Sequence, residues 1–193
     1  MKSTLYSAVA AVIGLLATSQ TEANDSYQFD QAGSTIAFEV HHFIGNATGK
    51  FNRFSGTIDL DRDHPEHSSI SVHIDVKSID TGIRKRDDHL QSAEFFNVAK
   101  FPEIMFESRS VKQTGRQSAD VMGDLTMHGV TQPIGLHVKL VGESAGEQSR
   151  WQVTTEPINR RLFGLVFSRS AEAISGIGRD VTTKIEIVAN AQR

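Results

Sequence analysis

The sequence predicts an all-β protein, an antiparallel sandwich or closed barrel of about eight strands joined by short polar turns. Apolar and polar residues alternate along several segments, which is the pattern of a strand with one buried face. A shift in this alternation near residue 52, together with nearby glycines, favours strong curvature and closure. The segments that alternate are 35–41, 47–60, 69–76, 104–111, 121–128, 134–140, 151–156 and 182–191.

The stretch 121–140 is the clearest pair of strands, because apolar residues take every second position on both arms of a hairpin. His128 and Gly129 begin the turn, and we expect the His128 ring to bond the backbone there. A single hairpin cannot bury its apolar face alone, so the other segments must cover it. The residues that share the inward face are Val121, Gly123, Leu125, Met127, Ile134, Leu136, Val138 and Leu140.

The segment 47–60 is expected to be one long strand with a bulge. Phe51 lies three residues before Phe54, so the apolar phase shifts by one residue between them. A one-residue shift inside a strand predicts a bulge that bends and twists the sheet. Gly49 and Gly56 are positions where such a strand could curve sharply.

Two connections, 77–101 and 159–178, lack the strand pattern and are expected to be irregular or short-helical. Both carry apolar side chains, which in a connection need a surface to cover. An open barrel mouth or an elongated apolar tunnel would provide that surface, although composition alone does not separate a hollow barrel from one filled by its own side chains. These residues are Phe95, Phe96, Phe101, Phe163, Phe167, Ile174 and Ile177.

Residues 1–23 are predicted to be a cleaved signal peptide. Lys2 is followed by an apolar run over 8–17 that is too short to span a bilayer, and small residues at 21 and 23 suit a signal peptidase. The remaining residues, 24–193, form one domain, and no second apolar run in them approaches membrane length. We therefore expect an exported protein of the periplasm.

Composition and motifs exclude several classes of function. The net charge of −3 argues against nucleic acid, which calls for a basic patch, and the absence of cysteine excludes thiol chemistry. No glycine-rich phosphate loop is present, so no cofactor is predicted. His64 and His67 are near acidic residues, but no two histidines share a strand face at adjacent positions, so no functional metal site is predicted. Ser168 and Ser170 lack the pattern of a nucleophile elbow.

Several motifs of this chain, which occur in the same order as in the family, resemble the YceI-like family of exported bacterial proteins that bind polyisoprenoids. They cover nearly the whole of 24–193, and together they are specific, although each alone is weak. The resemblance implies an extended, lipocalin-like antiparallel barrel that encloses an apolar tunnel for a long isoprenoid chain, such as a polyprenol or a quinone tail. The motifs are YQFD (27–30), GKFNRFSG (49–56), IDTG (79–82), RDDHL (86–90), SAEFF (92–96), GDLTMHGVT (123–131) and INR (158–160) followed by Phe163 and Gly164.

The candidate tunnel residues are the inward apolar side chains, and the alternative for each is plain core packing. Candidate contacts for a polar head group are Arg84, Arg86 and Arg160, against the alternative of a surface salt-bridge cluster around Arg84 and Arg86. The tunnel candidates are Ile36, Phe38, Val40, Phe51, Ile74, Phe106, Leu125, Met127, Leu136, Val138, Phe163 and Phe167.

The expected function is a non-enzymatic binding protein that sequesters or carries a long-chain isoprenoid or quinone-like lipid. A long hydrocarbon needs a dry, elongated slot with a few polar groups for its head. Two alternatives stay open: an enzyme that acts on a lipid held in the barrel, and a surface-interaction module that uses residues 77–101. An exposed apolar mouth would also favour a homodimer.

Overall fold

The computed structural model describes residues 25–43, 45–144, 147–167 and 176–192. The predicted signal peptide and Ile174 lie outside these residues. The short helices are η1 (Pro65–His67), η2 (Val76–Ser78), α1 (Arg84–Gln91) and η3 (Arg160–Phe163). The strands are β1 (Asp25–Phe29), β2 (Thr35–His42), β3 (Gly45–Phe51), β4 (Phe54–Leu60), β5 (Ser69–Asp75), β6 (Ile79–Asp80), β7 (Glu103–Gly115), β8 (Ser118–Met127), β9 (Val130–Ser144), β10 (Gln148–Thr155), β11 (Ile158–Asn159) and β12 (Asp180–Ala191).

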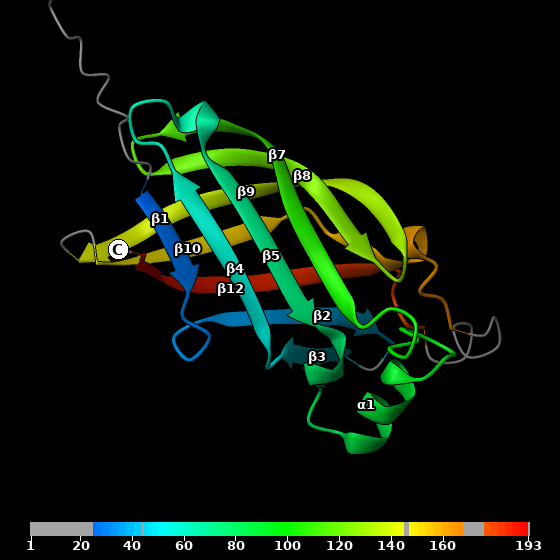
Figure 1. Cartoon of the computed structure of the whole chain (residues 1–193). Helices are drawn as coiled ribbons and strands as arrows, with labels where there is room; N and C mark the ends of the chain where they lie inside the picture. The colour runs from blue at the N-terminus through cyan, green and yellow to red at the C-terminus, as the bar shows by residue number, and fades with distance from the viewer. Residues whose placement is uncertain (1–24, 44, 145–146, 168–175, 193) are drawn as a thin grey trace, which may run out of the picture.

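Eight strands close into an antiparallel barrel (Figure 1). The ring runs β1–β4–β5–β7–β8–β9–β10–β12, and β1 closes it by pairing with β12 as well as with β4. A closed ring leaves no free sheet edge, so each strand can turn alternate side chains into the interior. The predicted all-β, antiparallel, lipocalin-like barrel is therefore confirmed.

The hairpin predicted at 121–140 is formed by β8 and β9, which pair from Met127–Val130 to Ser118–Lys139. Its two turn residues, His128 and Gly129, have φ angles of 54° and 75°. Positive φ at both central positions is the turn geometry that matches the twist of the flanking strands. The His128 ring donates from Nδ1 to the Phe163 carbonyl at 3.0 Å, which agrees with its predicted role as a turn residue that bonds the backbone.

The expected bulged strand over 47–60 is wrong in one respect: β3 and β4 are separate strands, interrupted at residues 52–53. The backbone groups at the break form hydrogen bonds with residues 75 and 78 of the same chain instead of continuing the ladder. Asn52 N donates to the Ser78 carbonyl at 3.1 Å, and Asp75 N donates to the Arg53 carbonyl at 3.0 Å. Bonds at such a break remove two residues from the strand, whereas a bulge would leave one extra residue within it.

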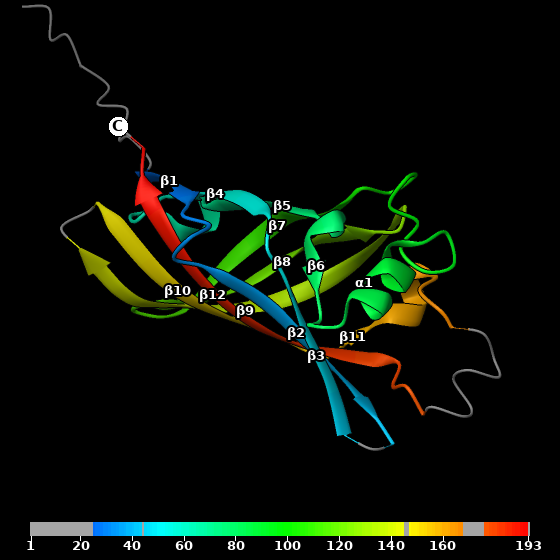
Figure 2. The same cartoon turned by 90° about the horizontal axis from the view of Figure 1, so that it is seen from below.

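The sheet is interrupted in the same way at three neighbouring places. Residues 30–34 separate β1 from β2, residues 52–53 separate β3 from β4, and η2 separates β5 from β6. Beyond the break, β2 pairs with β3 and β3 pairs with β6, and the three strands stay attached to β12 through β2. We call these three strands the leaf; Figure 2 shows its β2–β3 hairpin projecting away from the ring.

Helix α1 and the turns that follow it lie beside the leaf at one end of the barrel, here called the α1 end (Figure 1). Leu90, Phe95 and Phe96 are buried there, and Phe96 N donates to the Leu90 carbonyl at 3.0 Å. The predicted short helical segments thus provide apolar side chains where strand pairing stops. The opposite end, called the far end, carries the β7–β8 and β9–β10 turns. Within the residues that the structure describes, no helix is long and apolar enough to cross a membrane.

Ser34→Ala should destabilise the fold by about 1–3 kcal/mol, because it leaves a buried backbone donor without its partner. The Ser34 hydroxyl accepts from the buried Val188 N at 2.9 Å and donates to the Asp30 carbonyl at 2.6 Å, which ties the interruption between β1 and β2 to β12. Urea denaturation would measure the change. The matched control is Ser55→Ala, an exposed position on β4; equal midpoints for the two variants would contradict the prediction.

Candidate functional site

A cavity of about 820 Å³ runs along the interior of the barrel. Every strand of the ring contributes lining residues, as do β2, β3, α1 and η3. This volume is within the range of about 300–1,000 Å³ that small-molecule sites occupy. β12 alone has 12 residues, and such a strand spans ~40 Å at about 3.3 Å per residue, so the cavity has a long axis along which a chain could lie.

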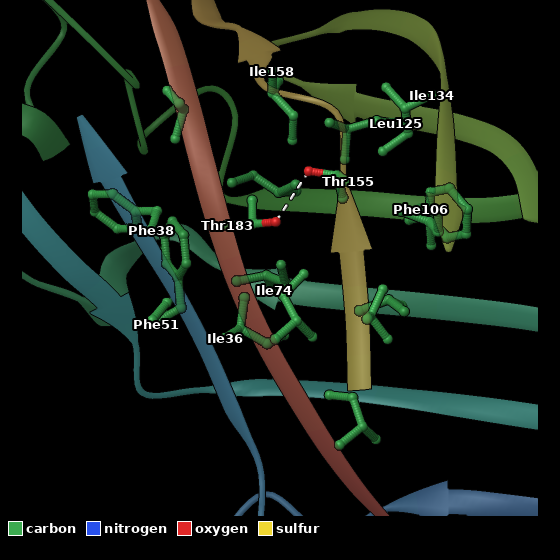
Figure 3. Close-up of a pocket in the computed structure, with 18 of the residues that line it drawn as sticks. Ile36, Phe38, Phe51, Ile74, Phe106, Leu125, Ile134, Thr155, Ile158 and Thr183 are labelled. Carbon is green, nitrogen blue, oxygen red and sulfur yellow. Dashed lines mark hydrogen bonds between the residues drawn. The ribbon is translucent and has the colours of Figure 1, made fainter. Parts of the chain in front are cut away.

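The middle of the cavity wall is apolar apart from Thr155 and Thr183 (Figure 3). Side chains from opposite parts of the ring point inward because successive residues of a strand face opposite sides of the sheet. The labelled apolar residues in this view are Ile36, Phe38, Phe51, Ile74, Phe106, Leu125, Ile134 and Ile158.

Two phenylalanine rings lie against glycines of the neighbouring strand, which helps to keep the interior hollow. A Cβ atom added to Gly49 would overlap the Phe38 ring, and one added to Gly123 would overlap the Phe106 ring. Each ring therefore occupies the space that a side chain on the next strand would need. This arrangement places part of the aromatic volume against the wall instead of across the lumen.

Charged and aromatic groups border the cavity at the α1 end. Arg86 donates from Nε to Thr81 Oγ1 at 2.7 Å and from Nη2 to the Thr81 carbonyl at 2.8 Å. The Phe167 ring stacks on Phe95 with 4.6 Å between centroids and on His89 with 5.9 Å. These contacts hold Arg86 and Phe167 at the border of the cavity.

Arg160 borders the cavity from a buried position, with 3% of its surface exposed. Its Nε donates to the Gly178 carbonyl at 2.9 Å, and its Nη1 donates to the Leu165 carbonyl at 2.6 Å. The guanidinium carbon also lies 5.1 Å from the centroid of the Phe167 ring, a cation–π arrangement. Arg160 therefore ties η3 to residues 177–178 and places a positive charge at the border of the cavity.

A polar cluster around the buried Tyr27 stands at the far end, and its charged side chains are partly exposed. Arg62 donates from Nε to Asp25 at 2.6 Å and from Nη2 to the Tyr27 hydroxyl at 3.0 Å, and it also pairs with Glu143. The Tyr27 hydroxyl donates to Glu143 at 3.1 Å, and no part of Tyr27 is exposed. Burial raises the pKa of Tyr27, with a further rise from its hydrogen bond to Glu143. The hydrogen bond to Asp25 raises the pKa of Arg62, so this guanidinium stays charged.

Eleven of the twelve predicted tunnel residues line the cavity; Phe163 is the exception. Phe163 is only 1% exposed and does not line this cavity, which differs from its expected place at the tunnel. Helix η3 turns this side chain into the core, a direction that the sequence of a short connection does not reveal. Among the head-group candidates, Arg86 and Arg160 border the cavity, whereas Arg84 is exposed on α1 and does not. Ligand contact by any of them stays a prediction.

Other lining residues were missed by the sequence analysis. β10 and β12 contribute Trp151, Val153, Thr155 and Thr183 to the cavity. Their strands alternate as expected, but an inward threonine is not recognised when only apolar residues are counted as inward. Period-two position relative to Val153 and Ile185 would have found both threonines.

The histidines do not form a metal centre in the part of the chain that the structure describes, where no group of three suitable ligands occurs. His64 lies 3.8 Å from Glu66, and His67 lies 3.6 Å from Asp61. Both pairs are in the polar connection around η1 at the far end.

Tyr27 should ionise above its ordinary pKa of 10.0 in the folded protein and at the ordinary value in urea. Because the folded state favours the neutral phenol, this stabilisation is complete below the unfolded pKa and is lost as pH rises through the folded pKa. In residues 24–193 Tyr27 is the sole tyrosine, so an absorbance titration of tyrosinate reads it directly. Glu143→Gln should lower the midpoint; a midpoint at the ordinary value in the folded wild type would contradict the burial argument.

Phe163→Ala should lower the free energy of unfolding by about 3–5 kcal/mol, because it leaves a cavity in the core. Thermal or urea unfolding would measure this loss. Leu162→Ala is the matched control on the same helix, since Leu162 is 57% exposed and surface changes usually stay within about 0.5 kcal/mol. Similar stability of the two variants would show that Phe163 does not pack as described.

The chain is similar to proteins of one family along most of its length. The YceI-like domain family matches residues 27–189. A UPF0312 protein of Pectobacterium atrosepticum is 39% identical over 147 residues, which are 74% of this chain and 74% of that protein. Protein YceI of Salmonella newport is 39% identical over 132 residues, which are 67% of this chain and 69% of that protein.

Solved structures share the fold. BcnA of Burkholderia cenocepacia has a TM-score of 0.76 at 23% identity and covers 84% of this chain and 99% of its own. The YCEI protein of Campylobacter jejuni has a TM-score of 0.67 at 27% identity and covers 79% and 90%. A polyisoprenoid binding domain from Saccharophagus degradans has a TM-score of 0.67 at 19% identity and covers 86% and 98%. With the closed barrel and its interior cavity, these similarities lead to one conclusion: the chain belongs to the YceI-like domain family.

Proposed function

We propose that this protein binds a long-chain isoprenoid, or a similar amphiphilic lipid of the polyprenol or quinone type, and sequesters or carries it in the barrel. The observation that supports this proposal is the elongated apolar cavity inside the closed ring of strands. The solved Saccharophagus degradans domain, which has the same fold, is described as polyisoprenoid binding.

The energetics of such a cargo suit this cavity. Burial of a hydrocarbon chain is worth roughly 0.8 kcal/mol for each CH₂ group. A long chain therefore binds without strong polar contacts, provided that the slot is dry and long enough. The apolar middle of the cavity would hold the chain, and Arg86 and Arg160 at the α1 end would lie near a polar head group.

Binding without catalysis fits the placement of polar groups. Among the described residues, the titratable side chains that border the cavity belong to its two ends or to the leaf, and the middle of the wall is apolar (Figure 3). General acid–base catalysis needs such a group within hydrogen-bond reach of the reacting atom. These titratable residues are His42, Asp61, Arg62, Arg86, His89, Arg116 and Arg160.

We further propose that the working protein is the single domain 24–193 in the periplasm. The basis is the leader-like sequence of residues 1–23. In that compartment a closed barrel would shield an apolar chain from water.

Native mass spectrometry of protein isolated from the periplasm, followed by organic extraction, tests the proposal. We expect a discrete added mass that resolves into a prenyl-chain compound. The same spectrum gives the mass of the assembly, which tests whether the protein forms the predicted homodimer. A bare polypeptide that takes up neither prenol nor quinone on incubation would overturn the proposed function.

Leu136→Trp should reduce the bound lipid several-fold, because the indole would occupy part of the lumen. Leu136 is on the inward face of β9 and lines the cavity. Lys139→Trp is the matched control, since Lys139 is exposed on the same strand. Extracted lipid per mole of protein is the measurement. Equal lipid content in the two folded variants would place the cargo elsewhere.

A further inference from the structure

Two threonine hydroxyls meet inside the otherwise apolar part of the cavity. Thr155 ends β10, Thr183 lies on β12, and their Oγ1 atoms are 3.0 Å apart. Both residues line the cavity, and Figure 3 shows the pair among isoleucine, leucine and phenylalanine side chains. This pair is polar, whereas the side chains around it in this view are apolar.

The hydrogen-bonding capacity of this pair is not used up. Each hydroxyl has one donor and two acceptor lone pairs. The bond between Thr155 and Thr183 uses one of the two donors, and neither hydroxyl has another partner among the described residues. One O–H group therefore remains available to an acceptor in the cavity. Both threonines are half-buried, and a cargo that fills the cavity would displace water from them. A donor that loses water without gaining an acceptor is costly, so an acceptor from the cargo would be favoured at this point.

The neighbours of the pair determine the kind of acceptor that fits. In the sheet, Thr183 pairs with Phe38 of β2, and Thr155 pairs with Leu136 of β9, so apolar residues flank the hydroxyls on both sides. Burying a charge in such surroundings is costly unless a counter-charge pairs with it. A phosphate or carboxylate is therefore disfavoured at this level, whereas an uncharged oxygen is not.

We propose that Thr155 and Thr183 form a binding site for an uncharged carbonyl oxygen of the cargo. This inference rests on the proposed function and narrows it. A plain hydrocarbon would leave the O–H donor unsatisfied, and a polyprenyl phosphate would offer its acceptors near the arginines at the α1 end. A cargo with a neutral carbonyl near the end of its isoprenoid chain satisfies both the donor and the apolar wall.

The position of the pair also fixes the direction of the cargo. Thr155 is the last residue of β10, and Thr183 is the fourth residue of β12, so both are near the α1 end. The walls of the same strands continue toward the far end through Val153, Ile185 and Ile187. The carbonyl would thus be held near the α1 end, and the hydrocarbon chain would extend toward Arg62.

The test uses two probes of equal chain length: an isoprenoid methyl ketone labelled with ¹³C at the carbonyl, and the corresponding isoprenoid hydrocarbon. The double variant Thr155→Val/Thr183→Val removes both hydroxyls and keeps the branched shape. Thr154→Val is the matched control, because Thr154 is exposed on the outer face of the same strand. Competition binding gives the affinities, and the infrared C=O stretch of the bound ketone reports its hydrogen bond.

For the wild type we expect a C=O stretch shifted to lower frequency than that of the ketone in hydrocarbon solvent. The double variant should lose this shift and bind the ketone about three- to tenfold more weakly, in line with one neutral hydrogen bond. Its affinity for the hydrocarbon should stay the same or rise, and Thr154→Val should resemble the wild type in every measurement.

An unshifted stretch in the wild type, or a shift that persists in the double variant, would overturn the carbonyl site. Equal loss of affinity for ketone and hydrocarbon would also overturn it, because the pair would then only stabilise the two strands. Tight binding of the hydrocarbon in those cases would leave the proposed function standing. Failure of both probes to bind the wild type would instead count against the proposed function itself.

Discussion

The hydrogen bonds of β12 on both of its edges are the constraint on which the rest of this molecule depends. One edge pairs with β10, and the other pairs with β2 and then with β1. Because β1 also pairs with β4, these contacts close the ring. Closure makes alternate residues of every strand face one common interior, so a local two-residue period becomes a cavity that all eight strands share.

A ring of this size would be filled by bulky side chains if each pointed straight across the lumen. The pairing of large residues with small ones prevents this. Phe38 takes the space above Gly49, and Phe106 takes the space above Gly123. Each of these glycines thus leaves room for an aromatic ring of the neighbouring strand beside the wall, which helps to keep the lumen open.

Period-two alternation was enough to predict an antiparallel sandwich or barrel and many of the inward apolar positions, because inward position on a strand depends only on local phase. Phe163 was misplaced because its segment is a short helix, for which apolar character says nothing about the direction of the side chain. The cluster of Tyr27, Arg62 and Glu143 could not be predicted, since only the closed ring brings these distant residues together. The hydroxyls of Thr155 and Thr183 were overlooked because polarity on an inward position resembles an interruption of the pattern.

Because of the break that separates the leaf from the ring, one side of the barrel is closed by side chains and a helix instead of by paired strands. Among the described strands, β6 pairs with β3 alone, and its other edge faces α1 without a ladder. On this side the wall is held by the side chains of Leu90, Phe95 and Phe96. Hydrogen bonds of Thr81 with Arg86 and Asp87 also cross this seam, but no ladder between the described strands does. Local opening at this seam would break side-chain contacts but no ladder of backbone hydrogen bonds, unlike the separation of two paired strands elsewhere in the sheet.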